Sequence, residues 1–243
     1  MISLERQDGR LLRIGHRGAA ALAPENTLTS FRAAVEAGVD LIEFDVIGGS
    51  DGALLVAHSL AEMQAETPTL EDVLQFFVEE APAVGVHVDL KRFGRERDVV
   101  DLLRRLGLVE RSFVSSVYVR TARRFAALDG PRTGITIPRA VLGISDDGRG
   151  AHVARFGLGA LRVAAPYLVR PLLAVTRASV VVMHHSIVTQ SSVRAAHARG
   201  AAVVTWTVDD PDELARVDQA GVDAVVTNDP RIFAPRSVST IRA

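Results

Sequence analysis

Several residue types are rare or missing in this chain of 243 residues, and each absence narrows the class of protein. There is no cysteine, which excludes disulfides, thiolate metal sites and cysteine nucleophiles. No apolar run is long enough to span a bilayer, and the N-terminus lacks the order of a signal peptide, so we expect a cytoplasmic protein. The net charge of -1 and the scattered basic residues provide no concentrated basic face, so we expect no nucleic-acid partner.

Lysine and asparagine are almost absent as well. Lys91 is the only lysine, and Asn26 and Asn228 are the only asparagines. A bias toward GC-rich codons would deplete both residue types together while enriching arginine and alanine. Lys91, Asn26 and Asn228 therefore mark positions where Arg, Ser or Asp would not perform the same role. The alternative is that they were retained by chance.

Short apolar runs alternate with amphipathic stretches along the whole chain. We predict strands at residues 11–16, 40–46, 84–91, 112–117, 132–137, 179–185, 201–206 and 223–228, and helices at residues 27–37, 69–80, 96–106, 119–128, 153–176, 189–199 and 210–220. Such alternation is typical of parallel strands joined by helical crossovers. Its length predicts a single α/β domain over residues 1–243, a closed (β/α)8 TIM barrel. The alternative is an open doubly wound sheet, which the missing glycine-rich fingerprint disfavours.

Polar residues occur near the ends of two predicted strands, where a barrel of this kind carries its active site. Glu43 and Asp45 alternate with apolar residues in one strand, and His87, Asp89 and Lys91 do so in the next. Because the apolar positions should face the helices, the polar ones should point into the barrel. Three carboxylates there would repel one another unless a cation neutralised them. Oxygen ligands favour Mg²⁺ or Ca²⁺ over zinc, and ion pairs with arginines are the alternative.

Several motifs occur in an order that resembles the glycerophosphodiester phosphodiesterase family. Residues 14–59, IGHRGAAALAPENTLTSFRAAVEAGVDLIEFDVIGGSDGALLVAHS, contain the H-R-G, P-E-N-T, E-x-D-V, D-G and following His elements of that family. Residues 89–91, DLK, resemble its acid-x-Lys motif, and residues 203–230 resemble its closing segment. The resemblance spans residues 14 to 233 and implies a TIM barrel that hydrolyses phosphodiesters in lipid metabolism with a divalent metal.

The resemblance also implies roles for individual residues in binding the metal and the phosphate. Carried over by motif, Glu43, Asp45 and Asp89 hold one divalent cation, Mg²⁺ or Ca²⁺. Arg17 and Lys91 bind the phosphate. A cation and two positive side chains would stabilise the negative charge that develops on a phosphodiester in the transition state.

The family's acid–base pair corresponds to His16 and His58. We favour His16 on the attacking side and His58 as the acid that protonates the departing alcohol, each contributing about 10²–10⁴ in rate. Trp206, the only tryptophan, should end the seventh strand. It is either an apolar wall for the substrate's leaving group or a core residue.

Three positions depart from the family pattern. Asp89 stands where the family commonly has Glu and is similar to the acid of sphingomyelinase D-type phospholipases. Ser59 follows His58 where an Asp is usual, so Glu62 becomes a candidate partner for the imidazole. Asn228 stands where Asp is usual.

Two further expectations concern residues near the predicted site. Asn26 should cap the helix that begins near residue 27, because asparagine is a preferred N-cap residue. Ser116, in a serine-rich strand segment that resembles the family, is a candidate substrate contact.

A deletion distinguishes the chain from the family. Residues 59–67 replace a long insertion that covers the site in the glycerophosphodiesterases, so a wider mouth could admit lysophospholipids or a membrane surface. Residues 152–179 could contribute a peripheral membrane contact through four regularly spaced arginines: Arg155, Arg162, Arg170 and Arg177. Arginines that snorkel on an outer barrel helix are the alternative, and Pro166 and Pro171 should interrupt this helix.

We therefore expect a metal-dependent hydrolase of glycerophosphodiesters or lysophospholipids. One alternative is a sphingomyelinase D-like enzyme in which the substrate's own hydroxyl attacks phosphorus and forms a cyclic phosphate. Another is a ligand-binding remnant of the fold without activity. The sequence leaves the head group, the choice between Mg²⁺ and Ca²⁺ and the oligomeric state open.

Overall fold

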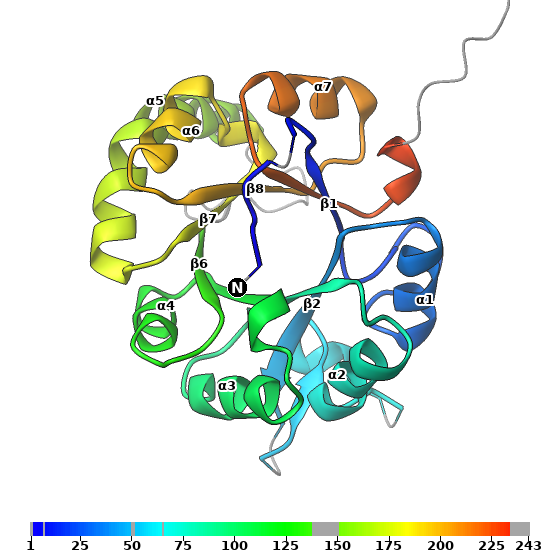
Figure 1. The fold of residues 1–243 in the computed structure, drawn as a ribbon. Helices are drawn as coiled ribbons and strands as arrows, with labels where there is room; N and C mark the ends of the chain where they lie inside the picture. Colours follow the sequence, from blue (N-terminus) through cyan, green and yellow to red (C-terminus); the bar gives the residue numbers. More distant parts are fainter. Residues whose placement is uncertain (1, 7, 50–51, 65, 138–150, 234–243) are drawn as a thin grey trace, which may run out of the picture.

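A closed barrel of parallel strands forms the centre of the molecule (Figure 1). The computed structural model describes residues 2–6, 8–49, 52–64, 66–137 and 151–233, with the backbone alone for residues 151–158. The barrel strands are β1 (Leu12–Gly15), β2 (Leu41–Gly48), β4 (Gly85–Leu90), β5 (Ser112–Ser116), β6 (Arg132–Ile137), β7 (Val180–His184), β8 (Ala202–Trp206) and β9 (Ala224–Thr227). Because β1 pairs with both β9 and β2, the ring is closed and the open-sheet alternative is wrong.

Helices surround the barrel and connect successive strands (Figure 1). They are α1 (Leu28–Glu36), α2 (Leu70–Glu79), α3 (Glu96–Arg105), α4 (Val119–Ala126), α5 (Ala151–Thr176), α6 (Gln190–His197) and α7 (Pro211–Gln219). Short 3₁₀ turns are η1 (Leu60–Glu62), η2 (Val109–Arg111), η4 (His185–Ile187) and η5 (Pro230–Phe233). Every predicted strand and helix is present, with ends within two residues of the prediction.

Local chemistry explains where several helices begin. Thr69 and Asp72 form a capping box at the start of α2, and Asp210 accepts hydrogen bonds from two backbone amides at the start of α7. The expectation that Asn26 caps α1 is wrong, because the cap is Thr27, whose side chain accepts from the amide of Ser30. Asn26 has a positive φ of 58° and faces the barrel instead.

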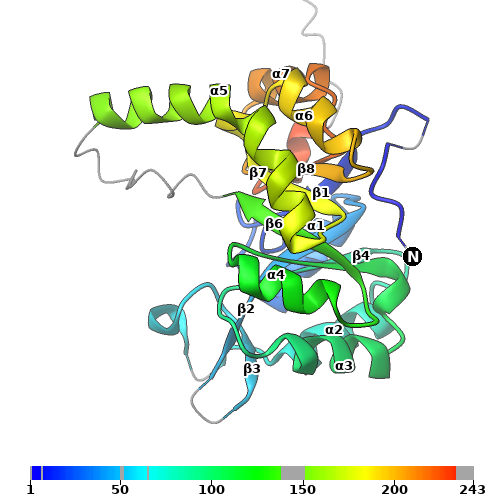
Figure 2. The same ribbon diagram turned by 90° about the vertical axis from the view of Figure 1, so that its left-hand side faces the viewer.

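A ninth strand was not predicted from the sequence. Strand β3 (Leu54–Val56) runs antiparallel to the end of β2 and lies outside the ring. Three residues are too few to show an alternating pattern, which is why the sequence analysis missed it. The hairpin extends beyond the barrel (Figure 2) and returns the chain so that His58 follows β3 by two residues.

The alternation of side chains divides the core into two parts. Ile42, Phe44 and Val46 of β2 face outward into the layer between strands and helices, where Phe44 packs 5.7 Å from Phe31 between ring centroids. Inside the ring, apolar side chains fill the end where the strands begin: Leu4, Leu12, Ile14, Leu41, Phe113, Val180, Ala202 and Ala224 are among them. The polar residues of β2 and β4 therefore occupy the opposite end.

Helix α5 is continuous through both of its prolines. Pro166 and Pro171 lie inside the helix, so the expectation that they interrupt it is wrong. A proline removes one backbone hydrogen bond and displaces the carbonyl four residues earlier, which bends a helix without necessarily ending it. Figure 2 shows the first half of α5 projecting away from the barrel and the second half returning along it.

A partly buried carboxylate joins the beginnings of β1 and β2. Asp40 accepts two hydrogen bonds from Arg10, at 2.9 and 3.0 Å, and one from the backbone N–H of Arg13 at 2.8 Å. Burial alone would raise the pKa of Asp40, but the two arginines lower it below its usual value. Asp40 therefore stabilises the fold above its unfolded pKa of about 4, and this contribution is lost as pH falls through the folded pKa.

We expect Asp40→Asn to lower the free energy of unfolding at pH 7 by about 1–3 kcal/mol, because charge-assisted hydrogen bonds are replaced by neutral ones. Urea denaturation of both proteins at pH 7 and at pH 3 measures this. The difference should shrink at pH 3, and Asp101→Asn, at an exposed pair with Arg104, should have little effect. A difference that is the same at both pH values would contradict the assignment.

Candidate active site

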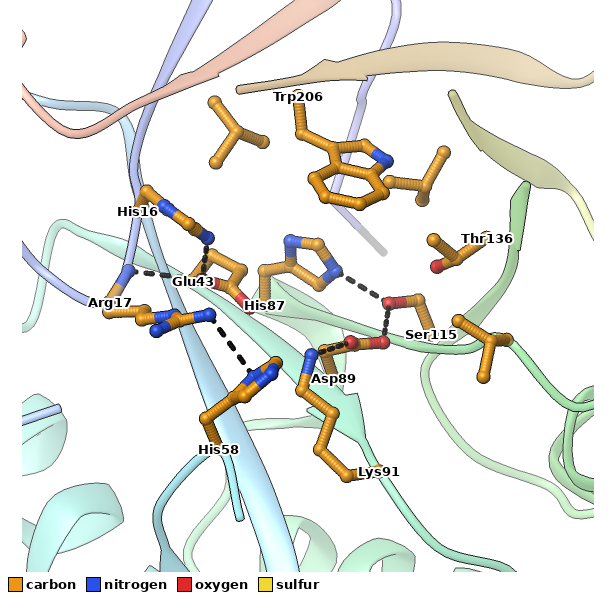
Figure 3. A pocket seen from close by; sticks show the side chains of 13 residues that line it. His16, Arg17, Glu43, His58, His87, Asp89, Lys91, Ser115, Thr136 and Trp206 are labelled. Carbon is orange, nitrogen blue, oxygen red and sulfur yellow. Dashed lines mark hydrogen bonds and ion pairs between the residues drawn. The ribbon is translucent and has the colours of Figure 1, made fainter. Parts of the chain in front are cut away.

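A cavity of about 320 Å³ opens inside the barrel at the end where the strands finish (Figure 3). Its polar wall consists of His16, Arg17, Glu43, His58, His87, Asp89, Lys91, Ser115, Thr136 and Trp206. Asp45 lies directly behind this wall and is fully buried. The structure thus brings together all of the residues that the sequence analysis singled out for metal, phosphate and acid–base roles.

Three carboxylates converge at this cavity from two neighbouring strands. Asp45 of β2 and Asp89 of β4 are direct partners in the sheet register, and Glu43 lies one pleat before Asp45. One oxygen from each of the three lies within 4.8 Å of the others. All three side chains are buried. This set of oxygen donors is suited to a single hard divalent cation.

Two positive side chains compensate part of the acidic charge. The Nζ of Lys91 lies 2.5 Å from Asp45 Oδ1 and 2.5 Å from Asp89 Oδ2, and Arg17 Nε lies 2.9 Å from Asp45 Oδ2. Burial would raise the pKa values of Asp45 and Asp89, but both are lowered, by Lys91 together with His58 and Arg17 at Asp45 and by Lys91 together with Ser115 at Asp89. The two aspartates in turn raise the pKa of Lys91 despite its burial. Both aspartates are therefore ionised and Lys91 is charged.

Glu43 is the carboxylate with the least compensation. It accepts a hydrogen bond of 3.0 Å from the backbone N–H of Arg17, and His16 Nε2 lies 3.9 Å from its Oε2. Burial, followed by the charge of Asp45, raises the pKa of Glu43 well above its usual value. A divalent cation between the three carboxylates would supply the positive charge that Glu43 lacks. The residues present therefore fit such an ion.

The H-R-G motif forms a turn that directs two side chains toward the cavity. Arg17 and Gly18 both have positive φ, 50° and 92°. A Cβ at position 18 would collide with the side chain of Ser30, so only glycine fits there. The turn leaves His16 and Arg17 at the rim, and Arg17 is held by Glu25 at 2.6 Å and by Asp45.

His16 is oriented by a hydrogen-bonded chain from the end of the barrel. Its Nδ1 lies 2.6 Å from Asn228 Oδ1, and Asn228 Nδ2 donates to Asp209 Oδ2 at 2.6 Å. Asp209 Oδ1 also accepts from the backbone N–H of Asn228 at 2.7 Å and from Thr227 Oγ1 at 2.9 Å. Burial, followed by the charge of Arg17, lowers the pKa of His16, so the imidazole is neutral at pH 7.

His58 lies on the outer side of the cavity and is partly exposed to solvent. Its Nδ1 is 3.1 Å from Asp45 Oδ2 and 3.1 Å from Arg17 Nη2. The carboxylate partner of His58 is therefore Asp45. The expectation that Glu62 takes this role is wrong, because Glu62 accepts a hydrogen bond of 3.0 Å from Ser59 Oγ.

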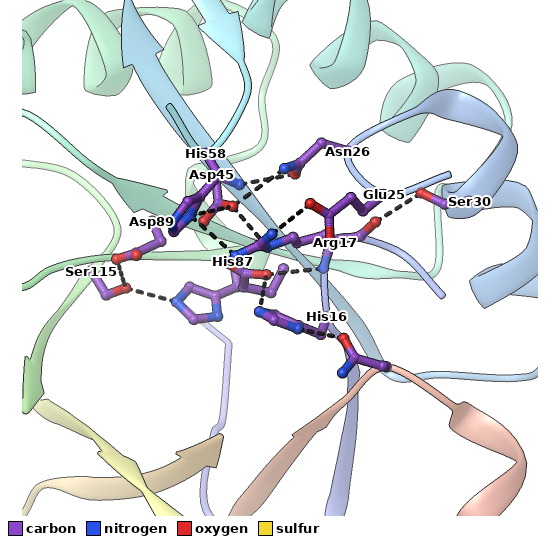
Figure 4. Close-up of polar contacts among 12 residues, drawn as sticks. His16, Arg17, Glu25, Asn26, Ser30, Asp45, His58, His87, Asp89 and Ser115 are labelled. Atoms are coloured by element: carbon purple, nitrogen blue, oxygen red, sulfur yellow. Dashed lines mark hydrogen bonds and ion pairs between the residues drawn. The ribbon is translucent and has the colours of Figure 1, made fainter. Parts of the chain in front are cut away.

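Asn26 holds Asp45 in place through two hydrogen bonds, a role that the sequence analysis missed (Figure 4). Its Nδ2 donates to Asp45 Oδ2 at 3.2 Å, and its Oδ1 accepts from the backbone N–H of Asp45 at 3.2 Å. Only an amide offers a donor and an acceptor in this arrangement. Its φ of 58° is tolerated by asparagine more readily than by most residues. These two demands explain why asparagine is retained here.

Ser115, and not Ser116, reaches the cavity. Ser115 Oγ donates to Asp89 Oδ1 at 2.7 Å and pairs with His87 Nε2 at 2.9 Å, whereas the buried Ser116 Oγ donates to the carbonyl of Leu90. The register that pairs Asp89 with Ser115 decides which serine faces inward. His87 lines the inner part of the cavity and is buried, and burial lowers its pKa to about 3, so its ring is neutral.

Trp206 lines the cavity at the end of β8 (Figure 3). Its ring lies edge-on to His184 of β7, with the ring centroids 5.3 Å apart. The partly buried indole provides an apolar surface beside the charged groups, where the sequence analysis placed it.

Positive side chains and imidazoles around a possible cation site are suited to an anionic ester. Together with the barrel, they define the class as a TIM-barrel hydrolase with its site at the carboxyl ends of the strands. The sequence model of the Glycerophosphoryl diester phosphodiesterase family matches residues 16–80 and 59–232. The chain belongs to this family.

Individual relatives agree with this family over most of the chain. A glycerophosphodiester phosphodiesterase of Arabidopsis thaliana is 26% identical over 250 residues, covering 90% of this chain and 70% of the relative. One from Caldanaerobacter subterraneus subsp. tengcongensis is 25% identical over 239 residues, covering 91% of this chain and 95% of the relative. A phosphodiesterase from Oleispira antarctica, solved in complex with the product sn-glycerol-3-phosphate, shares the fold with a TM-score of 0.66, 20% identity and coverage of 90% and 94%.

Proposed function

We propose that this chain hydrolyses glycerophosphodiesters to sn-glycerol-3-phosphate and an alcohol. The observation that carries the proposal is that three buried carboxylates, within 4.8 Å of one another, lie beside Lys91 and Arg17 in an open cavity. The family of the chain and the names of its relatives support this reaction. The Oleispira antarctica structure contains sn-glycerol-3-phosphate as the product, which supports the proposal that the phosphate stays on glycerol after hydrolysis.

Glu43, Asp45 and Asp89 would hold one divalent cation, Mg²⁺ or Ca²⁺. When bound, the cation would supply charge stabilisation to a non-bridging phosphate oxygen. Lys91 and Arg17 would release part of their contact with the aspartates and donate hydrogen bonds to the phosphate. A lysine suits this position, because a compact ammonium can lie between two carboxylates where a planar guanidinium presents its donors differently.

The chain of hydrogen bonds behind His16 supports its assignment as the general base. The carboxylate of Asp209 accepts hydrogen bonds, so the atom of Asn228 that faces it is the NH₂ group. The carbonyl oxygen of Asn228 must then face His16, and His16 Nδ1 must donate to it. This leaves Nε2 of a neutral ring, which faces the cavity, free to accept a proton from an attacking water.

His58 would act as the general acid for the departing alcohol. Its Nδ1 can donate to Asp45 Oδ2 at 3.1 Å, which orients the ring so that its other nitrogen is available to the substrate. Its position at the outer side of the cavity places it where a leaving group can reach solvent. His16 and His58 then have the roles that the sequence analysis favoured.

We expect Asn228→Ala to lower kcat by about 10–100-fold with little change in KM, because it removes only the group that orients His16. Asn228→Asp alone would place two carboxylates side by side. The double variant Asn228→Asp/Asp209→Asn keeps an acceptor for His16 Nδ1 and restores the bond between residues 228 and 209 with its direction reversed, so it should recover most of the rate. Histidine ¹⁵N NMR should show a proton on Nδ1 of His16 in the wild type and the double variant, and a mixture of tautomers in Asn228→Ala. Wild-type kcat and an unchanged tautomer in Asn228→Ala would contradict the role.

Apolar residues beside the cavity support lysophospholipids as further substrates. Val117 lines the cavity, and Tyr118 and Phe93 next to it are exposed, with their rings edge to face at a centroid distance of 6.2 Å. These three residues follow the neighbouring strands β4 and β5. The acyl chain of a lysophospholipid bound in the cavity could extend over these apolar side chains. A glycerophosphodiester without an acyl chain would need no such surface.

Phosphorus NMR of reaction mixtures tests the proposed function. Glycerophosphocholine and lysophosphatidylcholine are incubated with the protein and either Mg²⁺ or Ca²⁺, with and without a chelator. The expected products are the monoester phosphates, formed only while metal is present. If a cyclic phosphate accumulated, the substrate's own hydroxyl would be the attacking group and the proposal of hydrolysis by water would be wrong. Inactivity toward a broad panel of diesters would indicate a binding protein.

A further inference from the structure

One segment of the chain, about a quarter of its length, carries basic residues without acidic ones. Residues 148–208 contain seven arginines and no aspartate or glutamate, although the net charge of the whole chain is -1. Within the described part of this segment, α5 and α6 lie side by side on the outside of the barrel (Figure 1). The charge is therefore segregated onto one flank of the molecule.

Helix α5 packs on the barrel through one face. Leu161, Ala165, Val169 and Leu173 recur every four residues and are buried. Residues 163, 167, 170, 174 and 177 recur at intervals of three or four on the outward side and are exposed. The helix therefore has a distinct outward face.

The outward face is apolar where a helix exposed only to water would be polar. On this face Tyr167 is 79% exposed and Val163 73%, and on its flanks Val175 is 53% and Leu168 45% exposed. Arg170 lies on the same face, Arg177 directly follows the helix and Arg162 lies at the edge of the face, and all three are exposed. The structure describes the side chains of α5 from residue 159, so the side chain of Arg155, the fourth arginine of the predicted set, lies outside the described residues.

The position of α5 relates this face to the mouth of the barrel. Figure 2 shows its first half projecting past the end of β6, on the side where the strands finish and the cavity opens. The outward face begins at residue 163, where this first half ends, so a flat partner on it would lie along the flank of the barrel next to the side on which the cavity opens. Among the described residues, no helix is both long enough and apolar enough to cross a membrane.

We infer that the outward face of α5 binds the surface of a bilayer that contains anionic phospholipid. Exposed apolar and tyrosine side chains together with arginines, and no acidic residue, are the composition of a helix that lies in the membrane interface. The arginines match the negative lipid head groups, and Tyr167 and Val163 would enter the boundary of the acyl chains. A nucleic acid would match the arginines but leave these apolar side chains in water. The inference does not depend on the reaction at the cavity.

Sedimentation of the whole protein with vesicles tests this inference. We expect binding to vesicles of phosphatidylcholine mixed with phosphatidylglycerol, weaker binding at high salt, and no binding to phosphatidylcholine alone. Arg170→Gln/Arg177→Gln should weaken binding about thirtyfold, since each arginine near an anionic surface contributes about fivefold to the affinity. Val163→Ser/Tyr167→Ser should weaken it further at high salt, where the apolar contact dominates.

The matched control is Arg32→Gln/Arg97→Gln, which removes two exposed arginines from α1 and α3 on other sides of the barrel (Figure 1). The control should bind vesicles like the wild type, and all variants should keep wild-type melting temperature and activity on glycerophosphocholine. Equal binding by the α5 variants and the wild type would overturn the inference. So would a dimer that Val163→Ser/Tyr167→Ser converts to monomers without any vesicle binding, or binding to DNA in place of vesicles.

Discussion

Replacing Asp45 with asparagine is expected to lower kcat/KM by about 10³-fold, with a parallel loss of metal affinity. Asparagine has the same shape but no charge, so it removes one ligand of the cation. It also removes the carboxylate that Lys91 and Arg17 contact at 2.5 and 2.9 Å and that His58 approaches at 3.1 Å. A single substitution thus disturbs metal binding, phosphate binding and the orientation of the acid.

Steady-state kinetics and calorimetric titration with Mg²⁺ and Ca²⁺ measure the effect of Asp45→Asn. The matched control is Asp40→Asn, which changes the same residue type at the other end of β2. It should destabilise the fold yet keep kcat and metal affinity close to wild type. If Asp45→Asn kept wild-type metal affinity, the three carboxylates would not form the cation site.

Substituting the two histidines should have effects that differ with the leaving group. His58→Ala is expected to slow hydrolysis of glycerophosphocholine by about 10²–10⁴-fold, because an alkoxide needs a proton to depart. The same variant should hydrolyse bis-p-nitrophenyl phosphate at a rate close to wild type, because nitrophenolate leaves without protonation. His16→Ala should slow both substrates by a similar factor, because activation of water precedes either departure.

The rates of the two variants on both substrates measure these roles directly. His184→Ala serves as a control for removing an imidazole near the cavity, since His184 contacts Trp206 from β7, a strand that pairs with neither β2 nor β4. If His58→Ala slowed both substrates equally while His16→Ala depended on the leaving group, the two roles would be exchanged. If either variant kept near-native turnover, the histidine that it lacks would not belong to the acid–base pair.

Much of the fold follows from local patterns that a linear sequence contains. The alternation of Ile42, Phe44 and Val46 with Glu43 and Asp45 depends only on the period of a strand, so it predicts both the strand and its inward face. Helices recur between such strands with recognisable caps. The barrel was therefore predictable, whereas β3 was not, because three residues carry no usable period.

The same periodicity placed the acidic residues but could not identify their partners. Which serine reaches Asp89 depends on the register of β5 against β4, and a shift of one residue would replace Ser115 with Ser116. The sequence analysis named Ser116 from the resemblance of the serine-rich segment to the family, which does not fix the register. It also expected Glu62 to hold His58, because proximity along the chain was the only available guide.

The sequence by itself determined a closed α/β barrel, its family and the set of charged residues at the strand ends, since each depends on local period or on ordered motifs. Only the tertiary structure decided that Asn26 holds Asp45 in place, that Asn228 and Asp209 orient His16 and that α5 turns an apolar face outward. The physical reason is that a hydrogen bond joins atoms that are close in space. Asn228 and His16 lie 212 positions apart in the chain, and closure of β1 against β9 brings them together.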